Sequence, residues 1–295
     1  MPKFLKLAKS FSGWLLFILL SVIWGSSFIL MKLGMNALSP YQVATIRILS
    51  AGIVLLPFAV KAYKNIEKKK RIFVLLSGLL GSFFPAYLYC IAETKIDSSL
   101  AAILNSFTPL FTIIVGLSFF KLQAGIQKII GVAIGFAGLM LLPFTTQAGV
   151  NFGDMSYSLL VLLATICYAV NVNMVSRYLQ QTVSLNLASL AFSFLLVPSV
   201  IILIATGYFK LPLTDIKYMQ ATFASATLGI IGTAIATILF YMLVKKEGAL
   251  FASLVTYGIP VIAVMWGLVY GEHINLAEIG CLIVILVGVY IVNRK

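Results

Sequence analysis

The sequence predicts an all-α integral membrane protein, with ten transmembrane helices arranged as two inverted-topology repeats of five. Three observations lead to this prediction. Hydrophobic residues make up 61% of the 295 residues and charged residues only 10%, against roughly 45–50% and 25% in soluble domains. Ten apolar runs approach the length of about 20 residues that a helix needs to cross a bilayer core of about 30 Å. The second half of the chain also resembles the first at a nearly fixed offset.

The first apolar run follows the basic segment at residues 1–13 and has the general layout of a signal peptide. It is too long for the apolar part of a signal peptide and has no A-x-A cleavage pattern, so we interpret it as a retained first span. Nine further runs follow it. The expected spans are residues 14–33, 43–62, 72–92, 98–120, 124–143, 155–175, 184–207, 219–244, 249–270 and 275–293.

The positive charges indicate which loops face the cytoplasm, because cytoplasmic loops carry an excess of Lys and Arg. The loops assigned to the inside carry sixteen of the 21 basic residues. Those assigned to the outside carry four, Lys32, Lys95, Lys210 and Lys217, and Arg47 lies within a span. Both termini are therefore expected in the cytoplasm. The expected segments are a cytoplasmic N-terminal segment at 1–13, a first repeat at 14–143, an external linker at 144–154 and a second repeat at 155–293.

An internal repeat relates the two halves. A shift of 151 residues superposes the third, fourth and fifth spans on the eighth, ninth and tenth, and sets Pro109 on Pro260. A shift of 144 sets the first span on the sixth, and a shift of 141 sets Pro57 on Pro198 in the second and seventh. Five spans per repeat is an odd number, so the second repeat must enter the membrane with the opposite orientation. Inverted repeats are typical of transporters with a midplane solute site, although a duplication retained only for stability has the same pattern.

Composition and motifs exclude several functional classes. The net charge of +13 lies between apolar runs rather than on a basic face in water, so nucleic acid is not an expected partner. Three cysteines inside spans and a single histidine, His273, predict neither a disulfide framework nor a metal site, and no cofactor is expected. The sequence has no phosphate-binding loop motif, so an ATP-driven pump is not expected.

All eight acidic residues are expected in loops or at the ends of spans. Carboxylates inside the membrane are the usual proton carriers of transporters. The sequence therefore favours facilitated diffusion or exchange over proton coupling.

Several motifs carry a family resemblance. They are WGSSF at residues 24–28, ATIRILSAG at 44–52, and two paired stretches at 98–120 and 248–272. These motifs resemble those of the drug/metabolite transporter superfamily, specifically its EamA-type family of ten-span proteins. One departure is that Gly271-Glu272, which ends the ninth span, corresponds to Phe120-Lys121 in the first half.

The resemblance implies a secondary transporter in the cytoplasmic (inner) membrane of a bacterium. It implies export or exchange of small metabolites, with amino acids as the leading substrate class, by alternating access and without enzymatic activity. The expected partners are a small-molecule substrate and the lipid bilayer. The sequence leaves the exact substrate, the coupling ion, the direction of transport and the oligomeric state open.

Arg47 is the one charge well inside a predicted span, about four residues below its outer boundary. A cation in the membrane costs about 2.5–3.5 kcal/mol at a helix centre on insertion scales, and marks a functional site by default. Two interpretations remain open. Arg47 either reaches the interface or nearby backbone carbonyls, or it contacts an anionic group of the substrate.

Polar and aromatic residues recur at helical spacing in five spans, which predicts a common cavity. The polar residues of each such stripe could instead form ordinary hydrogen bonds to neighbouring helices or to the backbone of their own helix. Ser77 and Ser118 lie off these stripes. Pro109 and Pro260 are candidate hinges, or bends that the helices tolerate. The candidate substrate-binding residues are Trp24, Ser27, Arg47, Asn105, Thr108, Tyr168, Asn171, Thr237, Tyr241, Thr256 and Tyr257.

Glycines in the fifth and tenth spans are expected at close helix contacts within the protomer. Two functions from other classes remain as alternatives. An intramembrane enzyme or lipid-modifying factor would need a polar triad or a carboxylate pair inside the membrane, and none is visible. A membrane sensor without flux would share every feature described above.

Overall fold

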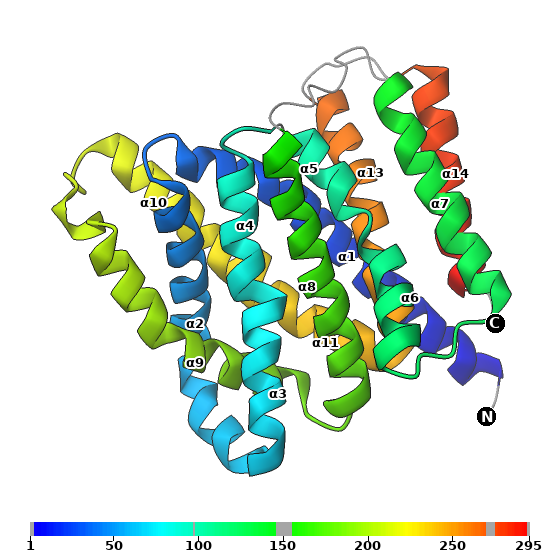
Figure 1. Ribbon diagram of the computed structural model, residues 1–295, viewed down its shortest axis with the longest axis horizontal. Coiled ribbons are helices and arrows are strands. Elements are labelled where there is room, and N and C mark those ends of the chain that lie inside the picture. Colours follow the sequence, from blue (N-terminus) through cyan, green and yellow to red (C-terminus); the bar gives the residue numbers. More distant parts are fainter. Residues whose placement is uncertain (1–2, 97, 146–154, 270–274, 294–295) are drawn as a thin grey trace.

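The computed structural model describes residues 3–96, 98–145, 155–269 and 275–293, and all regular structure within them is helical. Eight helices are long and apolar enough to cross a membrane. Two shorter apolar helices, Ile126–Leu142 and Ala249–Ile262, lie in the fifth and ninth predicted runs. The all-α membrane fold predicted from composition is therefore confirmed (Figure 1).

The first half of the chain forms the helices of the first five runs. They are α1 (Lys3–Met35), α2 (Pro40–Asn65), α3 (Lys68–Gly78), η1 (Leu79–Phe83), α4 (Phe84–Ala92), α5 (Ser98–Asn105), α6 (Thr108–Phe119) and α7 (Ile126–Thr145).

The second half repeats this order, with one additional short turn. Its elements are α8 (Met155–Tyr178), α9 (Ser184–Ala205), η2 (Tyr208–Lys210), α10 (Ile216–Gly229), η3 (Ile230–Ile235), α11 (Ala236–Glu247), α12 (Ala249–Ser253), α13 (Val255–Val269) and α14 (Leu276–Asn293).

The start of α2 shows how local sequence sets a helix end. Ser39 accepts a hydrogen bond from the Gln42 backbone, and the Gln42 side chain accepts one from the Ser39 backbone. This capping box satisfies two backbone donors that the first turn leaves free. Pro40 follows at the first helical position, where its missing N–H costs nothing. At the junction of α11 and α12, Gly248 adopts a φ of 90°, which favours glycine.

Both long helical segments in the third and eighth runs contain a π-helix at the same place. The segment η1 covers Leu79–Phe83 and η3 covers Ile230–Ile235. The same shift that superposes the third run on the eighth sets the first residue of η1 on the first residue of η3. Short π-helical turns inside α-helices occur frequently at functional sites, because the wider turn leaves backbone carbonyls without a helical partner. The repeat therefore extends to an irregularity of the backbone.

The fourth and ninth runs are also interrupted. The first break separates α5 from α6, and Pro109 lies in the first turn of α6. The second break separates α12 from α13, and Pro260 lies inside α13. A hinge at these breaks stays a prediction.

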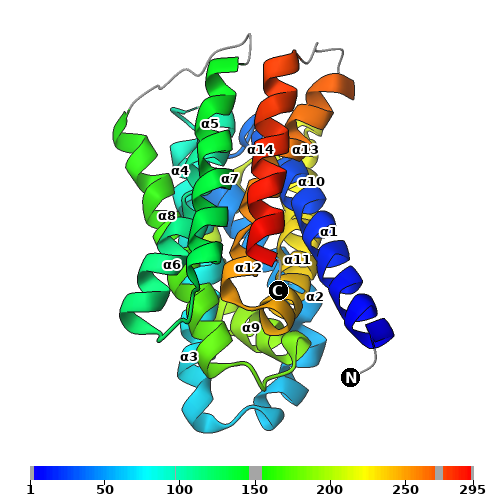
Figure 2. The same cartoon turned by 90° about the vertical axis from the view of Figure 1, so that its right-hand side faces the viewer.

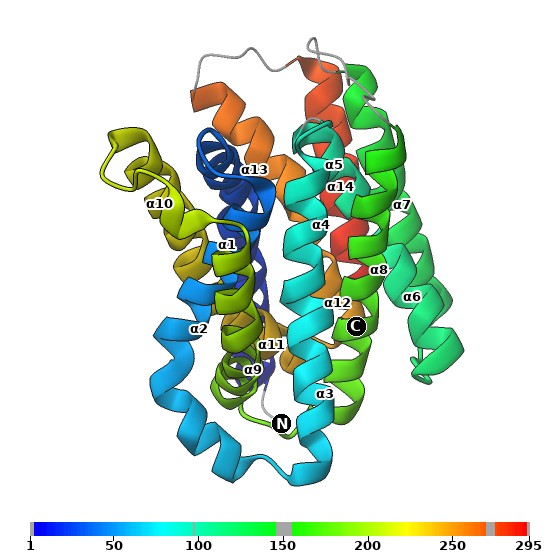
Figure 3. The same cartoon turned by 60° about the vertical axis from the view of Figure 1, so that its left-hand side comes forward.

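The two halves interlock through repeat-related contacts. The helix α2 packs along α9, and α7 packs along α14 (Figure 2). In the first half, α1 contacts α10 and α13, and its counterpart α8 contacts α4 and α6. Figure 3 shows α2 and α9 on one side of the bundle and α4 and α8 on the other. Each first helix thus packs mainly on the opposite half.

Glycines permit the close contact of α7 with α14. A Cβ atom at Gly131 would lie 2.9 Å from the carbonyl oxygen of Gly288. At Gly138 it would lie 3.0 Å from the carbonyl oxygen of Cys281. The predicted glycine contact within the protomer is present at these positions. Gly280 instead faces open space, so the prediction is wrong for that residue.

Candidate functional site

A cavity of about 100 Å³ lies between the two halves. Its lining comes from the first-half elements α1, α2, η1, α4, α5 and α6, and from the second-half elements α8, η3, α11, α12 and α13. Ten of the eleven candidate residues predicted from the sequence line it. They are Trp24, Ser27, Arg47, Asn105, Thr108, Tyr168, Asn171, Thr237, Tyr241 and Thr256.

Arg47 lines the cavity from α2. Its side chain is partly buried, and its Nε donates a hydrogen bond of 2.6 Å to Thr233 Oγ1 of the opposite half. Thr233 in turn donates to the Leu228 carbonyl at 3.2 Å. Among the described residues, no carboxylate forms an ion pair with Arg47. The guanidinium therefore carries a positive charge at the cavity wall with nitrogen donors for a bound anion.

A hydrogen-bonded network includes two residues of the cavity lining, Asn171 and Tyr241. Ser77 Oγ donates to Asn171 Oδ1 at 2.8 Å, and the Tyr241 hydroxyl lies 2.7 Å from the same Ser77 oxygen. All three side chains are buried. The network joins α3 of the first half to α8 and α11 of the second. Ser77 was expected to be unrelated to the site, and the structure instead places it in contact with two cavity residues.

Trp24 contacts the backbone of η3. Its indole Nε1 donates a hydrogen bond of 3.0 Å to the Gly232 carbonyl. The wider turn of a π-helix makes such a carbonyl available to an outside donor. The first helix of one half is thus bound to the irregular segment of the other.

The hydroxyl protons of three predicted residues are used on backbone carbonyls three or four residues earlier in the chain. Ser27 donates to the Ile23 carbonyl, Thr108 to the Asn105 carbonyl and Thr256 to the Ser253 carbonyl. This is the local bonding that the sequence left as an alternative. The oxygen atoms remain acceptors, so these residues offer acceptors to a ligand rather than donors.

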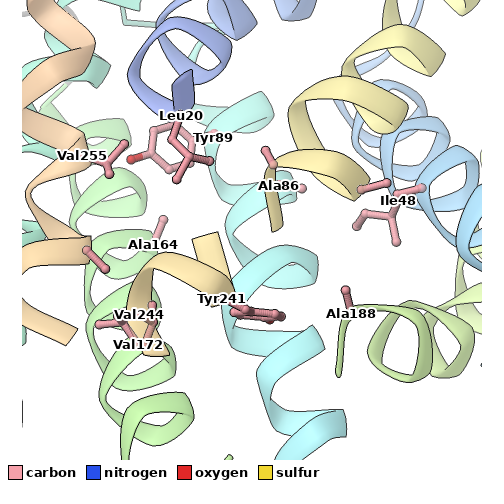
Figure 4. Close-up of a cluster of buried hydrophobic side chains, with 14 of the residues drawn as sticks. Leu20, Ile48, Ala86, Tyr89, Ala164, Val172, Ala188, Tyr241, Val244 and Val255 are labelled. Carbon is pink, nitrogen blue, oxygen red and sulfur yellow. The ribbon is translucent and has the colours of Figure 1, made fainter. Parts of the chain in front are cut away.

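Aromatic rings form the apolar part of the lining. Tyr89 and Tyr168 stack with centroids 6.2 Å apart and an interplanar angle of 29°. Trp24 and Phe240 lie 5.3 Å apart at 54°. Figure 4 shows Tyr89 and Tyr241, which both line the cavity, within a cluster of buried hydrophobic side chains.

Tyr257 is the one candidate residue outside the cavity lining. It is fully buried, and its hydroxyl donates a hydrogen bond of 3.1 Å to the Val132 carbonyl of α7. Its ring packs on Gly135, where a Cβ atom would lie 2.7 Å from a ring carbon. Tyr257 therefore joins α13 to α7.

Sequence reasoning missed cavity residues in the third span. Gly81, Ser82 and Tyr89 line the cavity, and none was among the candidates. The shift between the third and eighth spans relates Ser82 to Thr233, which lies at helical spacing with Thr237 and Tyr241, so the repeat could have found Ser82. Ser253 was also missed, although it lies at helical spacing with Thr256, whereas the apolar lining residues have no sequence signal of their own. They include Phe28, Met31, Val172, Ala252 and Ile259.

Some predicted features lie outside the described residues. They are most of the external linker, at 146–154, and the Gly271-Glu272 pair with His273. Within the described part of the chain, no group of three or more His, Cys, Asp or Glu residues is arranged to hold a metal ion.

Comparisons with known proteins support the repeat and a membrane location. A model of the EamA-like transporter family matches residues 11–144 and again residues 155–294. An uncharacterized inner membrane transporter of Escherichia coli, YedA, is 27% identical over 93% of this chain and 88% of its own. An uncharacterized transporter of Archaeoglobus fulgidus is 26% identical over 96% of this chain and 99% of its own.

A solved crystal structure of a protein has a TM-score of 0.70 and 16% sequence identity, covering 95% of this chain and 96% of that one. At this identity the likeness shows the fold alone. The two family matches divide the chain into the two halves that enclose the cavity.

Proposed function

This chain belongs to the EamA-like transporter family of the drug/metabolite transporter superfamily, and on this premise we propose that it is a secondary transporter of small amphipathic metabolites, with amino acids as the leading class. It is a multi-pass membrane protein whose relatives include inner membrane transporters. The observation that carries the proposal is the cavity, which both repeats line with polar and aromatic side chains.

The chemistry of the lining fits a ligand with an anionic head and an apolar body. Arg47 offers a cation without an ion-pair partner among the described residues. Asn105 and Asn171 offer amide groups, and Tyr89, Tyr168 and Trp24 offer rings. Guanidinium groups bind carboxylates through paired hydrogen bonds, and most of a small ligand's surface is usually buried against apolar walls. A carboxylate next to a hydrophobic side chain matches this arrangement.

Transport in this proposal proceeds by alternating access, with export or exchange as the direction. The two repeats have inverted topology and rock against each other around the cavity. The breaks at α5–α6 and α12–α13, next to Pro109 and Pro260, are the proposed hinges. The contacts of α1 with α10 and of α8 with α4 join the opposite halves, so they lie across the interface at which this movement would take place.

A ligand screen tests the proposal. Ligands that bind the folded state raise its stability by about 2.7 kcal/mol at a concentration 100 times the dissociation constant. We expect amino acids to raise the melting temperature of purified protein. The amino acid with the largest effect should also be transported by proteoliposomes. Absence of both effects across the amino acids would refute the proposed substrate class. Binding without flux would favour the sensor.

The proposed orientation places both termini in the cytoplasm of a bacterial cell. The basic segment at residues 61–71, which covers the end of α2 and the start of α3, lies at the same end of the bundle as the start of α1 and the end of α14, which supports this orientation (Figure 1). Single cysteines at Lys68 and Lys210 would test it with an impermeant thiol reagent on intact cells. We expect labelling at Lys210 and none at Lys68. The reverse result would contradict the orientation.

A further inference from the structure

Glu93 is a buried carboxyl that the proposed transport function does not use. It is the first residue after α4, and only 9% of its surface is exposed. Ser98 donates a hydrogen bond of 3.0 Å to Glu93 Oε2. The other oxygen, Oε1, is buried without a hydrogen-bond partner. An ionised carboxylate in this environment lacks the solvation that it needs.

The groups that act on Glu93 come from four elements. Lys32 approaches from α1 and Arg47 from α2, Tyr89 and Cys90 lie on its own helix, and Ser98 belongs to α5. Asp97 lies outside the described residues. Burial raises the pKa of Glu93 to about 8, although Ser98, Lys32 and Arg47 each act to lower it. The carboxyl is therefore mainly neutral at pH 7 and ionises around pH 8.

The fold does not require a carboxyl here. The shift between the third and eighth spans relates Glu93 to Val244 and Ser98 to Ala249. Both counterparts are buried, at 0% and 1% exposed, and Val244 belongs to the apolar cluster drawn in Figure 4. The second half thus fills the equivalent position with hydrocarbon. A buried ionisable group at a position where an apolar one fits is a functional-site candidate.

Tyr89 connects Glu93 to the cavity. It precedes Glu93 by four residues, so the two side chains lie on the same face of the helix. Tyr89 lines the cavity, and its hydroxyl is also buried without a hydrogen-bond partner. Two polar atoms without partners thus lie in succession between the outer end of α4 and the cavity. Arg47, which lines the cavity, interacts electrostatically with both residues.

We propose that Glu93 is the proton-binding site of this transporter and that its protonation is coupled to anion binding at Arg47. Ionised Glu93 attracts the Arg47 charge. A bound carboxylate takes over this attraction and adds negative charge near Glu93, so that an ionised Glu93 takes up a proton from water. Linkage is reciprocal, so protonation of Glu93 also strengthens anion binding. This proposal rests on the proposed transport function, and it adds the proton coupling over which the sequence favours facilitated diffusion or exchange.

Infrared difference spectroscopy of the protein in lipid nanodiscs tests the site without any substrate. As the pH rises, the carbonyl band of a protonated carboxylic acid should disappear, with a midpoint near pH 8. Glu93→Gln should remove this band, and Ser98→Ala should move the midpoint to higher pH. The matched control is Glu67→Gln, because Glu67 is exposed and pairs with Lys70. A band unaffected by Glu93→Gln, or a midpoint below pH 6, would overturn the assignment.

A second measurement tests whether protonation of Glu93 also controls the proposed movement of the helices. Spin labels are placed at Asn36, in the turn after α1, and at the exposed Leu159 of α8, in a Cys167→Ala background. The distance between the two labels reports how far the helix groups that carry α1 and α8 open. We expect the label distance to change with pH around the same midpoint. The Glu93→Gln variant should keep the low-pH distance at every pH. If wild type and variant respond alike, or neither responds, the proton is not coupled to the movement. Because no substrate is added, failure here is distinct from failure of the substrate class.

Discussion

The two π-helices have the same backbone but different surroundings. A Cβ atom at Gly81 of η1 would collide with the Asn171 amide of α8, and one at Gly232 of η3 would lie 2.8 Å from Ser27 Oγ of α1. The internal repeat relates these two contacts to each other, since it pairs the two glycines and also pairs Ser27 with Asn171. In both cases a glycine in a π-helix admits a polar side chain from the first helix of the opposite half. Duplication has therefore preserved the backbone contact and changed the side chain.

The polar residues around the two contacts have diverged further. Arg47 corresponds to Ala188 in the second half, and Tyr241 corresponds to Cys90 in the first. One part of the cavity thus carries a cation bound to Thr233, and another carries a phenol bound to Ser77. The difference indicates that repeated backbone geometry serves the movement and that unequal side chains orient the ligand.

The largest expected effect comes from filling the two glycine contacts. Gly81→Ala and Gly232→Ala should each lower transport at least tenfold, because overpacking costs about 1–3 kcal/mol. Gly81→Ala should be worse, since Asn171 is tied to Ser77 whereas Ser27 bonds only within its own helix. Melting temperatures and proteoliposome flux measure both effects. Asn171→Ser should partly restore Gly81→Ala. If the two glycine variants lost transport equally and Asn171→Ser restored nothing, the two contacts would not differ in the way described above.

The next effect concerns the charge that only one half carries. Arg47→Lys keeps the charge but loses the planar paired donors. Hydrogen bonds to charged groups contribute about 1.5–3 kcal/mol, so affinity for an anionic amphipathic ligand should fall about tenfold or more. Expression and melting temperature should stay near normal. Loss of folding, with no selective loss of binding, would instead assign Arg47 to structure.

Smaller effects are expected at the residues on either side of the helix breaks. Asn105→Ala and Thr256→Ala remove polar atoms from repeat-related positions of the cavity wall. Each should lower affinity by about 0.5–1.5 kcal/mol, the net contribution of one hydrogen bond. Isothermal titration of the stabilising ligand measures the change. Ser118→Ala is the control, because Ser118 is exposed away from the cavity. If only one of the two variants lost affinity, the ligand would bind mainly to the half that carries that residue.

Helix positions and much of the cavity could be predicted because both follow from local periodicity. Apolar length defines a span, and spacing of three to four residues defines a face. The π-helices could not be predicted, since their sequences are as apolar as the neighbouring turns. The burial of Glu93 was also missed. A residue at the end of a span is buried only if the following helix packs over it, and the sequence does not show that packing. Helical periodicity correctly predicted Asn105 and Tyr241 in the cavity lining, whereas the same criterion left Ser77 out of the site.

The smallest expected effect separates Tyr257 from its neighbour Thr256. Consecutive residues on a helix point about 100° apart, so only one of them faces the cavity. Tyr257→Phe removes the hydroxyl that donates to the Val132 carbonyl but keeps the ring on Gly135. Hydrogen bonds between membrane helices contribute about 0.6 kcal/mol on average. The melting temperature should therefore fall slightly while ligand affinity stays unchanged. Tyr257 has no aromatic counterpart in the first half, where the repeat relates it to Ser106. A tenfold loss of affinity in Tyr257→Phe would mean that α13 turns this residue toward the ligand during transport, and the contact between α7 and α13 would then belong to the moving part of the protein.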